Sequence, residues 1–167
     1  VIINWFLPFS NYNVRIYSRF KRLFGENPLI ITKSKTILGL LRCLQIIPYL
    51  ENIGIRCNIN NFEKKADITI FVRWQDSKAF ELLKREKDKG SKVIFDLNVN
   101  YFDSAGTFPG NYGVKEQNVK EVKLMVTEAD VITCASKYIR DRALDYNSNS
   151  EYIPDSVNLK HFRFQKK

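Results

Sequence analysis

The stretch Asp130-Val-Ile-Thr-Cys-Ala-Ser-Lys-Tyr-Ile-Arg140, followed by Tyr152-Ile-Pro154, decides the fold class of this chain. The apolar run at residues 131–134 predicts a buried strand, and Ser136 is the expected N-cap of a helix over residues 137–146. A second short strand at Tyr152 then leads out of the unit through Pro154. A strand, a helix and another strand in this order are typical of the last unit of a Rossmann-like domain.

The rest of the chain alternates short apolar runs with longer segments of helical periodicity, which predicts a parallel sheet covered by helices. The predicted strands span residues 1–7, 29–32, 55–59, 68–72 and 93–97, and the predicted helices span residues 13–24, 40–52 and 77–89 and the region 119–129. Pro48 predicts a kink or an early break in its helix. We therefore expect a Rossmann-like three-layer α/β/α sandwich with a mainly parallel sheet over residues 1–153, with residues 1–28 as a candidate extension.

The charge balance is strongly basic: 27 Lys and Arg stand against 18 Asp and Glu, a net charge of +9 over 167 residues. The length suits one domain, and 44% hydrophobic residues are enough for a real core. The charge bias favours an anionic partner, such as a phosphorylated substrate, a membrane surface or a nucleic acid. A coding bias toward Lys, Asn and Ile explains the same excess without a partner, and both interpretations stay open.

The cysteines Cys43, Cys57 and Cys134 are widely spaced in apolar contexts, so we expect buried, reduced thiols of the kind found in cytosolic proteins. A metal site is not expected, because the chain has no Cys-x-x-Cys and His161 is its only histidine. No apolar run reaches the ~18 residues of a membrane-spanning helix, and the N-terminal residues lack the basic start of a signal peptide. These features predict a cytoplasmic protein.

From Lys92 onward the sequence predicts a buried strand that ends in Asp96, then a polar and aromatic loop, and then a helix. A strand and a helix N-cap follow, in Ala129-Asp130-Val-Ile-Thr-Cys-Ala-Ser136. The chain then leaves the unit through Tyr152-Ile-Pro154-Asp-Ser-Val157-Asn-Leu-Lys-His-Phe162. This order resembles the N-terminal domain of GT-B glycosyltransferases, in particular the retaining family called glycosyltransferase group 1 or family 4. In that family a strand and helix of the form AD.vi..S..l precede viPNgvD...F at the entry to the second domain. The resemblance extends from about Leu29 to Phe162.

Earlier segments resemble the same family. They are Leu41-Arg42-Cys-Leu-Gln45 with Tyr49-Leu-Glu-Asn-Ile-Gly54 for its first helix, Ala66-Asp67-Ile-Thr-Ile-Phe-Val72 for its third strand, and Phe95-Asp96-Leu97-Asn98 for its fourth. The chain also departs from the family pattern. Asp155-Ser156-Val157-Asn158 replaces the usual Asn-Gly-Val-Asp, and the glycine pair that often follows the first strand is absent from residues 33–40.

The resemblance implies that residues 1–153 form the acceptor-side lobe of an enzyme that transfers a sugar from a nucleotide-sugar to a glycan, a lipid-linked acceptor or another acceptor. Residues 154–167 then begin the linker to a C-terminal lobe that this chain lacks. In the family that lobe grips the nucleotide-sugar with a pair of glutamates. The resemblance implies no cofactor besides the donor substrate, and the chain is expected to be inactive without its second lobe.

Ligands of open α/β sheets bind beyond the carboxyl ends of the strands. The candidate substrate-binding residues are Arg73, Trp74, Asp96, Asn98, Asn100, Asp103 and Ser136, and the resemblance adds Arg42. Arg73 offers a bidentate donor and Trp74 a flat stacking surface for a sugar or phosphate, although Trp74 equally suits a cover for the sheet edge.

Other polar residues at these strand ends have structural alternatives. The resemblance places Asp96 near the acceptor, and a strand-end Asp also suits a cap for the following turn. Asn98, Asn100 and Asp103 suit either sugar hydroxyls or the backbone of their own loop. Ser136 heads a helix whose amides can receive an anion, but helix capping alone explains this serine.

Arg15, Arg19 and Arg22 share one face of the predicted helix 13–24, opposite an apolar face. Such a surface suits anionic headgroups at the inner face of a membrane, which is useful for a lipid-linked acceptor. A helix packed on the sheet with a solvated basic face shows the same pattern.

The competing functional class is a non-catalytic Rossmann-like or flavodoxin-like module that holds an anion such as a nucleic acid. Nucleic acid is the less favoured partner, because aromatic and basic residues are not interleaved in a recognisable RNA-binding motif. A dinucleotide enzyme is also disfavoured, because no Gly-x-Gly-x-x-Gly follows a predicted strand.

Overall fold

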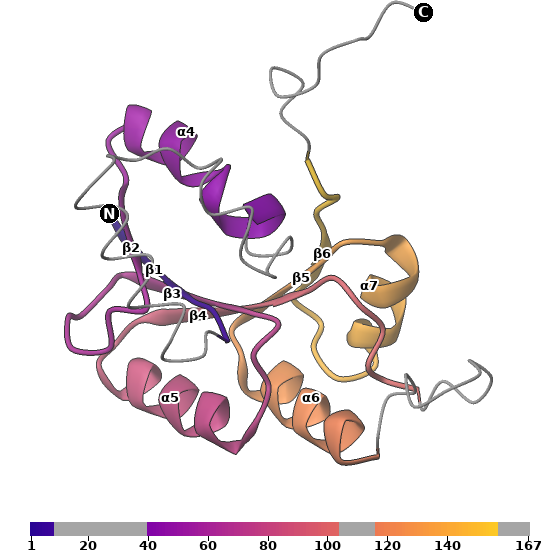
Figure 1. Ribbon diagram of the computed structural model, residues 1–167. Helices are drawn as coiled ribbons and strands as arrows, with labels where there is room; N and C mark the ends of the chain where they lie inside the picture. Colours follow the sequence, from indigo (N-terminus) through magenta and orange to yellow (C-terminus); the bar gives the residue numbers. More distant parts are fainter. Residues whose placement is uncertain (9–39, 104–115, 157–167) are drawn as a thin grey trace, which may run out of the picture.

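The computed structural model describes residues 1–8, 40–103 and 116–156, and it confirms the predicted α/β class (Figure 1). Six strands form one parallel sheet in the order β2-β1-β3-β4-β5-β6. The strands are β1 (Ile2–Phe6), β2 (Arg56–Ile59), β3 (Ile68–Val72), β4 (Lys92–Leu97), β5 (Val131–Cys134) and β6 (Ser150–Tyr152). The helical segments are the π-helix η1 (Leu40–Leu44), α4 (Ile47–Asn52), α5 (Ser77–Asp88), α6 (Glu116–Glu128) and α7 (Lys137–Leu144).

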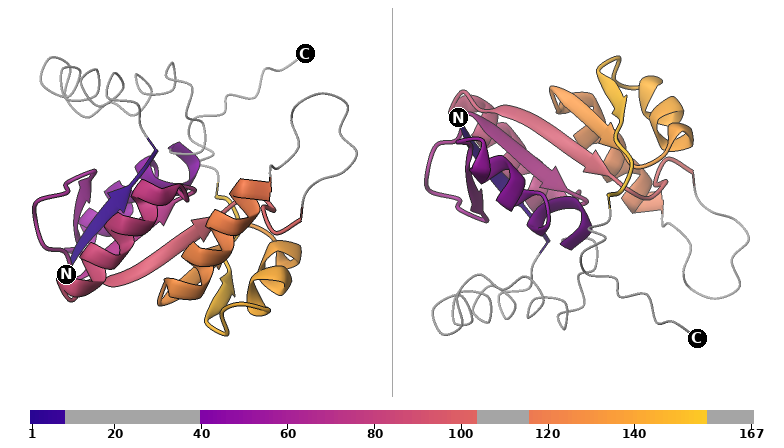
Figure 2. Two further views of the ribbon diagram at one scale, coloured as in Figure 1. Left: turned by 90° about the horizontal axis from the view of Figure 1, so that it is seen from below. Right: turned by 90° about the horizontal axis from the view of Figure 1, so that it is seen from above.

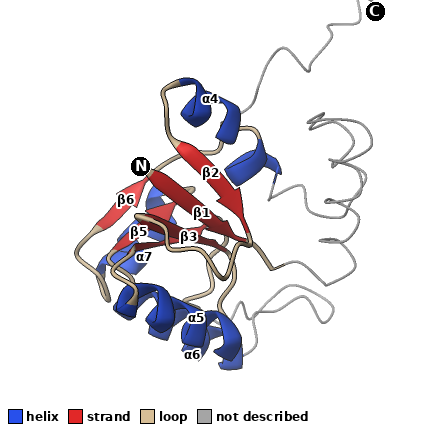
Figure 3. Ribbon diagram, turned by 90° about the vertical axis from the view of Figure 1, so that its left-hand side faces the viewer, coloured by secondary structure: helices blue, strands red, loops and turns tan. Residues whose placement is uncertain are grey.

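Helices cover both faces of this sheet and produce the three layers of a Rossmann-like sandwich (Figures 1 and 3). Segments η1 and α4 lie on one face, whereas α5 and α6 lie on the other, as the views from above and below show (Figure 2). Helix α7 belongs to the second group, because its Ile139 and Ala143 join the buried cluster that contains residues of α5 and α6.

Alternate side chains of the central strands enter two separate cores. In β1, Phe6 packs in the cluster under α5 and α6, whereas Trp5 packs with Cys43 and Leu44 of η1. Phe71 of β3 enters the first cluster and its neighbour Ile70 the second. Strands covered on both faces appear in the sequence as continuous apolar runs, which is the pattern that predicted them.

The strand order identifies β1 as the centre from which the chain winds outward in both directions. It is the 2-1-3-4-5 order of flavodoxin-like doubly wound sheets with one further strand at the edge. Ligands of such sheets bind at the switch point, beyond the carboxyl ends of the first and third strands. In this chain Leu7 and Pro8 follow β1 there, and Arg73 and Trp74 follow β3.

The segment predicted as one helix over residues 40–52 is two helical segments. η1 ends at Leu44, and α4 begins at Ile47 with Pro48 in its first turn. Proline is tolerated in this position because the first N–H groups of a helix have no helical partner. The predicted early break exists, but it precedes Pro48, which helps to begin a new helix.

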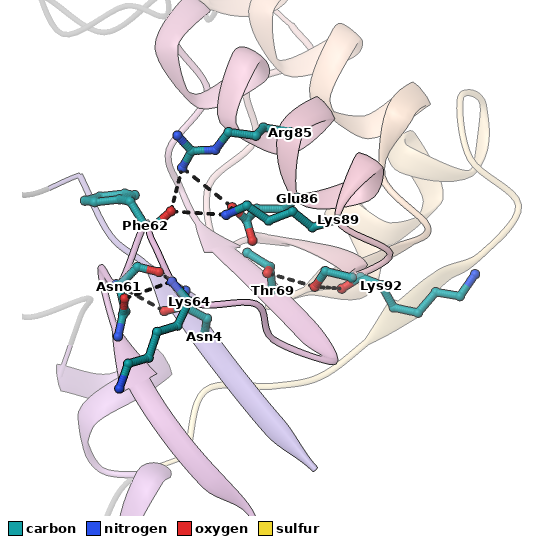
Figure 4. A network of polar contacts seen from close by, with 10 residues as sticks. Asn4, Asn61, Phe62, Lys64, Thr69, Arg85, Glu86, Lys89 and Lys92 are labelled. Carbon is teal, nitrogen blue, oxygen red and sulfur yellow. Dashed lines mark hydrogen bonds and ion pairs between the residues drawn. The ribbon is translucent and has the colours of Figure 1, made fainter.

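Residues 60–67 connect β2 to β3 without a helix and are fixed to both β1 and α5 (Figure 4). Asn4 of β1 donates to the carbonyl of Asn61 at 2.6 Å and accepts from its amide at 3.3 Å. Arg85 and Lys89 both donate to the carbonyl of Phe62, at 3.0 and 3.1 Å. These hydrogen bonds replace the packing that a crossover helix provides elsewhere in the fold.

The predicted helix 13–24 and strand 29–32 lie outside the described residues. None of the helices in the described part of the chain is long and apolar enough to cross a membrane. The three cysteines are free thiols, as expected, and Cys43 and Cys134 are buried. Cys57 is only partly buried, because it lies in β2 at the edge of the sheet.

Candidate functional site

Arg73 follows β3 at the switch point with a left-handed backbone conformation, φ 52°. This conformation costs a non-glycine residue about 1–3 kcal/mol and persists only where the surrounding structure holds it. Its Nε donates to the hydroxyl of Tyr101 at 2.5 Å, and its guanidinium carbon lies 5.6 Å from the centre of the Tyr101 ring. Among the described residues no carboxylate pairs with Arg73, so this guanidinium retains N–H donors for a ligand.

Trp74 is half-buried beside Arg73 and packs against the core cluster beneath α5 and α6. Its ring meets the Phe62 ring edge-on, with centroids 6.3 Å apart and planes at 76°. Trp74 therefore covers part of the sheet edge. Trp74 and its sequence neighbour Arg73 are both only partly buried.

Asp96 and Arg42 come together in a buried ion pair, with side chains only 6% and 5% exposed. Nε of Arg42 donates to one carboxylate oxygen of Asp96 at 2.9 Å, and Nη2 donates to the other. Thr133, the register partner of Asp96 in β5, donates its hydroxyl to the same carboxylate. Burial lowers the pKa of Arg42, but hydrogen bonds and charge from Asp96 and Asp155 outweigh it and raise that pKa overall.

The same arginine contacts the segment that leaves the sheet after β6. Nη1 of Arg42 donates to the carbonyl of Ile153 at 2.8 Å and to Asp155 at 3.2 Å. One turn along, the Gln45 side chain donates to the carbonyl of Ser156. Arg42 therefore joins η1, β4 and the exit from β6 at one point.

The loop after β4 is attached to α7 through Asp103. Its carboxylate accepts from Asn100 at 3.1 Å and from Arg142 at 2.8 Å, and the Tyr138 hydroxyl lies 3.4 Å away. Hydrogen bonds, first from Asn100 and then from Arg142, hold the pKa of Asp103 below its ordinary value. Asn100 and Asp103 thus bond mainly to protein groups in this structure.

In the part of the chain that the structure describes, two side-chain acceptors that follow β3 and β4 lack hydrogen-bond partners. They are Oδ1 of Asn98, which follows β4, and Oε1 of Gln75, which follows the neighbouring β3; both atoms are buried. A buried acceptor without a partner costs about 1–3 kcal/mol. Ser136, by contrast, is the confirmed N-cap of α7, because its hydroxyl accepts from the amide of Ile139 at 3.2 Å.

Sequence reasoning did not select Tyr101, Thr133 or Asp155. Thr133 lies beside Asp96 in the sheet register, and the alternation of β5 side chains could have placed it on that face. Tyr101 and Asp155 left no such signal, because their partners Arg73 and Arg42 lie in distant parts of the chain.

The membrane-surface candidates Arg15, Arg19 and Arg22 lie outside the described residues. In the part of the chain that the structure describes, no cluster of His, Cys, Asp and Glu could hold a metal ion.

Comparison with known proteins adds no assignment: no family model and no curated protein matches this chain.

Proposed function

We propose that this chain forms the acceptor-side lobe of a glycosyltransferase that moves a sugar from a nucleotide-sugar to a glycan, a lipid-linked acceptor or another hydroxyl-bearing acceptor. The proposal rests on one observation. Arg73 stands at the switch point of a doubly wound sheet with a left-handed backbone and, among the described residues, no carboxylate partner. Strained, polar residues in such positions cluster at ligand sites.

The groups that follow β3 and β4 suit a polyhydroxy ligand better than a simple anion. Arg73 offers N–H donors, Trp74 an aromatic side chain, and Asn98 and Gln75 buried oxygen acceptors that lack partners among the described residues. A sugar carries hydroxyl groups that both donate and accept, and its apolar ring face packs on aromatic rings. Orienting one acceptor hydroxyl toward the activated donor is the main task of such a lobe.

Asp96 and Arg42 support this site indirectly in our proposal. Both carboxylate oxygens of Asp96 accept hydrogen bonds from Arg42 or Thr133, so the carboxylate is occupied by protein groups. The pair holds the carboxyl ends of β4 and β5 in a fixed position next to the exit from the sheet. The leaving diphosphate of the donor is bound and stabilised by a second lobe, and no cofactor takes part.

The reaction takes place on the cytoplasmic side in this proposal, with Arg15, Arg19 and Arg22 at the surface of the membrane when the acceptor is lipid-linked. Co-sedimentation with phosphatidylglycerol vesicles tests the membrane contact, and replacement of the three arginines by glutamine is expected to abolish it.

The test of the proposed function is sugar transfer by the product of the full reading frame. The protein is incubated with UDP-, GDP- and dTDP-sugars and with glycan and lipid acceptors, and release of the nucleoside diphosphate is measured. We expect acceptor-dependent release with one donor, together with coding sequence past Lys167 for a second βα lobe with two glutamates eight positions apart. A reading frame that ends at Lys167, combined with steeply salt-dependent binding to random DNA or RNA, would instead identify an anion-binding module.

A further inference from the structure

Asp155 is a surplus carboxylate on Arg42. The positive charge of Arg42 is already balanced by Asp96, which binds it through two contacts and is 6% exposed. Asp155 adds a second negative charge through one contact of 3.2 Å, and its side chain is 41% exposed. Neither charge balance nor burial of Arg42 by Asp96 requires this second carboxylate.

The guanidinium of Arg42 has five N–H hydrogens. One on Nε and one on Nη2 go to Asp96, and the two on Nη1 go to the Ile153 carbonyl and to Asp155. The fifth, on Nη2, has no partner among the described residues. Removal of Asp155 therefore leaves two donors, one on each Nη atom, which is the arrangement that binds an oxyanion through two oxygens.

The position of these donors is also that of a ligand site. Arg42 reaches the carboxyl ends of β4 and β6, the edge at which open α/β sheets bind their ligands. Asp155 is the residue that occupies the outer side of Arg42, and it belongs to the segment by which the chain leaves the sheet. Displacement of Asp155 therefore frees an N–H donor on Arg42 and also removes the contact that holds Asp155 against Arg42.

We propose that Asp155 is a built-in competitor for an oxyanion site on Arg42, so that a phosphate-type oxyanion bound there releases Asp155 and Ser156 from their contacts with Arg42 and Gln45. The Arg42–Asp96–Thr133 contacts stay in place during this exchange. The contacts of Asp155 with Arg42 and of Ser156 with Gln45 are the ones that open. Binding at the sheet edge is thereby coupled to the direction in which the chain leaves the domain. This inference does not depend on sugar transfer.

The test compares binding of inorganic pyrophosphate to the wild-type chain and to Asp155→Ala by calorimetry. Asp155→Ala is expected to bind about fivefold more tightly, the ratio that corresponds to an exposed ion pair near the top of its usual range. The matched control is Asp145→Ala, which removes the same charge from a contact with Arg142 at 3.4 Å and leaves Arg42 unchanged. The control is expected to bind as the wild type does.

A second readout, in the wild-type chain, is the NMR signal of the Gln45 side-chain amide together with hydrogen exchange at the Ile153 backbone amide. Saturating pyrophosphate is expected to shift the Gln45 side-chain signal as Ser156 moves away, while the Ile153 amide keeps its bond to the Cys134 carbonyl and stays protected. Equal pyrophosphate affinity of Asp155→Ala and Asp145→Ala, or absence of binding to both, would overturn the proposal.

Sedimentation with phosphatidylglycerol vesicles identifies the source of the phosphate. If Asp155→Ala sediments more strongly than the wild type, the site binds a lipid headgroup. If the chain binds pyrophosphate but does not sediment with the vesicles, the site binds a soluble phosphate.

Discussion

Arg42 and Asp96 form a buried ion pair that joins η1 to β4 across 54 positions of sequence. Both side chains are almost completely enclosed, and both oxygens of the carboxylate are hydrogen-bonded. Loss of one partner of such a pair leaves an uncompensated charge in the interior, which costs far more than the pair itself contributes.

Asp96→Ala is therefore expected to lower the free energy of unfolding by about 3 kcal/mol, the lower end of the range for breaking a buried pair, because the buried guanidinium of Arg42 keeps only the partly exposed Asp155 as a charge partner. Urea denaturation measures the change. The matched control is Asp141→Ala, which removes a carboxylate from the exposed pair with Arg140 and should change stability by less than about 0.5 kcal/mol. Equal losses in the two variants would show that the Arg42–Asp96 pair does not hold this edge together.

Arg73→Gly separates backbone strain from side-chain function. Both Arg73→Gly and Arg73→Ala lose the side-chain contact with Tyr101, but glycine adopts a φ of 52° without steric cost, whereas alanine retains the strain. We expect the Gly variant to be more stable than the Ala variant by about 1 kcal/mol. Thermal unfolding of both measures the difference, and an Ala variant as stable as the Gly variant would rule out strain at this position.

The attachment of the loop after β4 to α7 is expected to weaken in acid. The pKa of Asp103 is lower in the folded state than its ordinary value of 3.8, so its contribution to stability is present above that value. The contribution is lost as pH falls through the lower folded-state pKa. Denaturation between about pH 5 and about pH 3 should show a smaller acid-induced loss in Asp103→Asn than in the wild type. Identical losses in the two proteins would contradict a depressed pKa.

The three thiols should differ in reactivity. Burial raises the pKa of Cys134 to about 12 and places that of Cys43 well above its ordinary value, so neither forms thiolate near neutral pH. Cys57 also has a raised pKa, again mainly through burial, but it is only partly buried. Iodoacetamide labelling followed by mass spectrometry should modify Cys57 first and the other two only after unfolding. Early modification of Cys134 would show that its strand opens in the native state.

The sequence allowed the central strands β1, β3 and β4 to be predicted because they are covered on both faces and are rich in apolar residues. Ser136 could be predicted as a cap because its partner, the amide of Ile139, lies three residues away. Pro48 was harder to interpret, since a proline can interrupt a helix or begin one.

The contacts of the candidate site could not be predicted in the same way. The strand ends predicted which edge of the sheet carries the candidate site, but Arg42 meets Asp96 and Asp155 only after the whole chain has folded. The left-handed conformation of Arg73 has no signature in the residue itself, because arginine rarely adopts it. Long-range partners and strained backbone are properties of tertiary structure, and local patterns do not encode them.

The central claim is that Arg73 holds the acceptor of a glycosyltransferase at the switch point. Steady-state kinetics of sugar transfer by the product of the full reading frame test it most directly, with Arg73→Ala compared with Arg140→Ala, an arginine whose partner is the exposed Asp141. We predict that Arg73→Ala raises KM for the acceptor at least about tenfold with KM for the nucleotide-sugar unchanged, while Arg140→Ala matches the wild type. Wild-type kinetics in Arg73→Ala, or no sugar transfer by any of the proteins, would contradict the account.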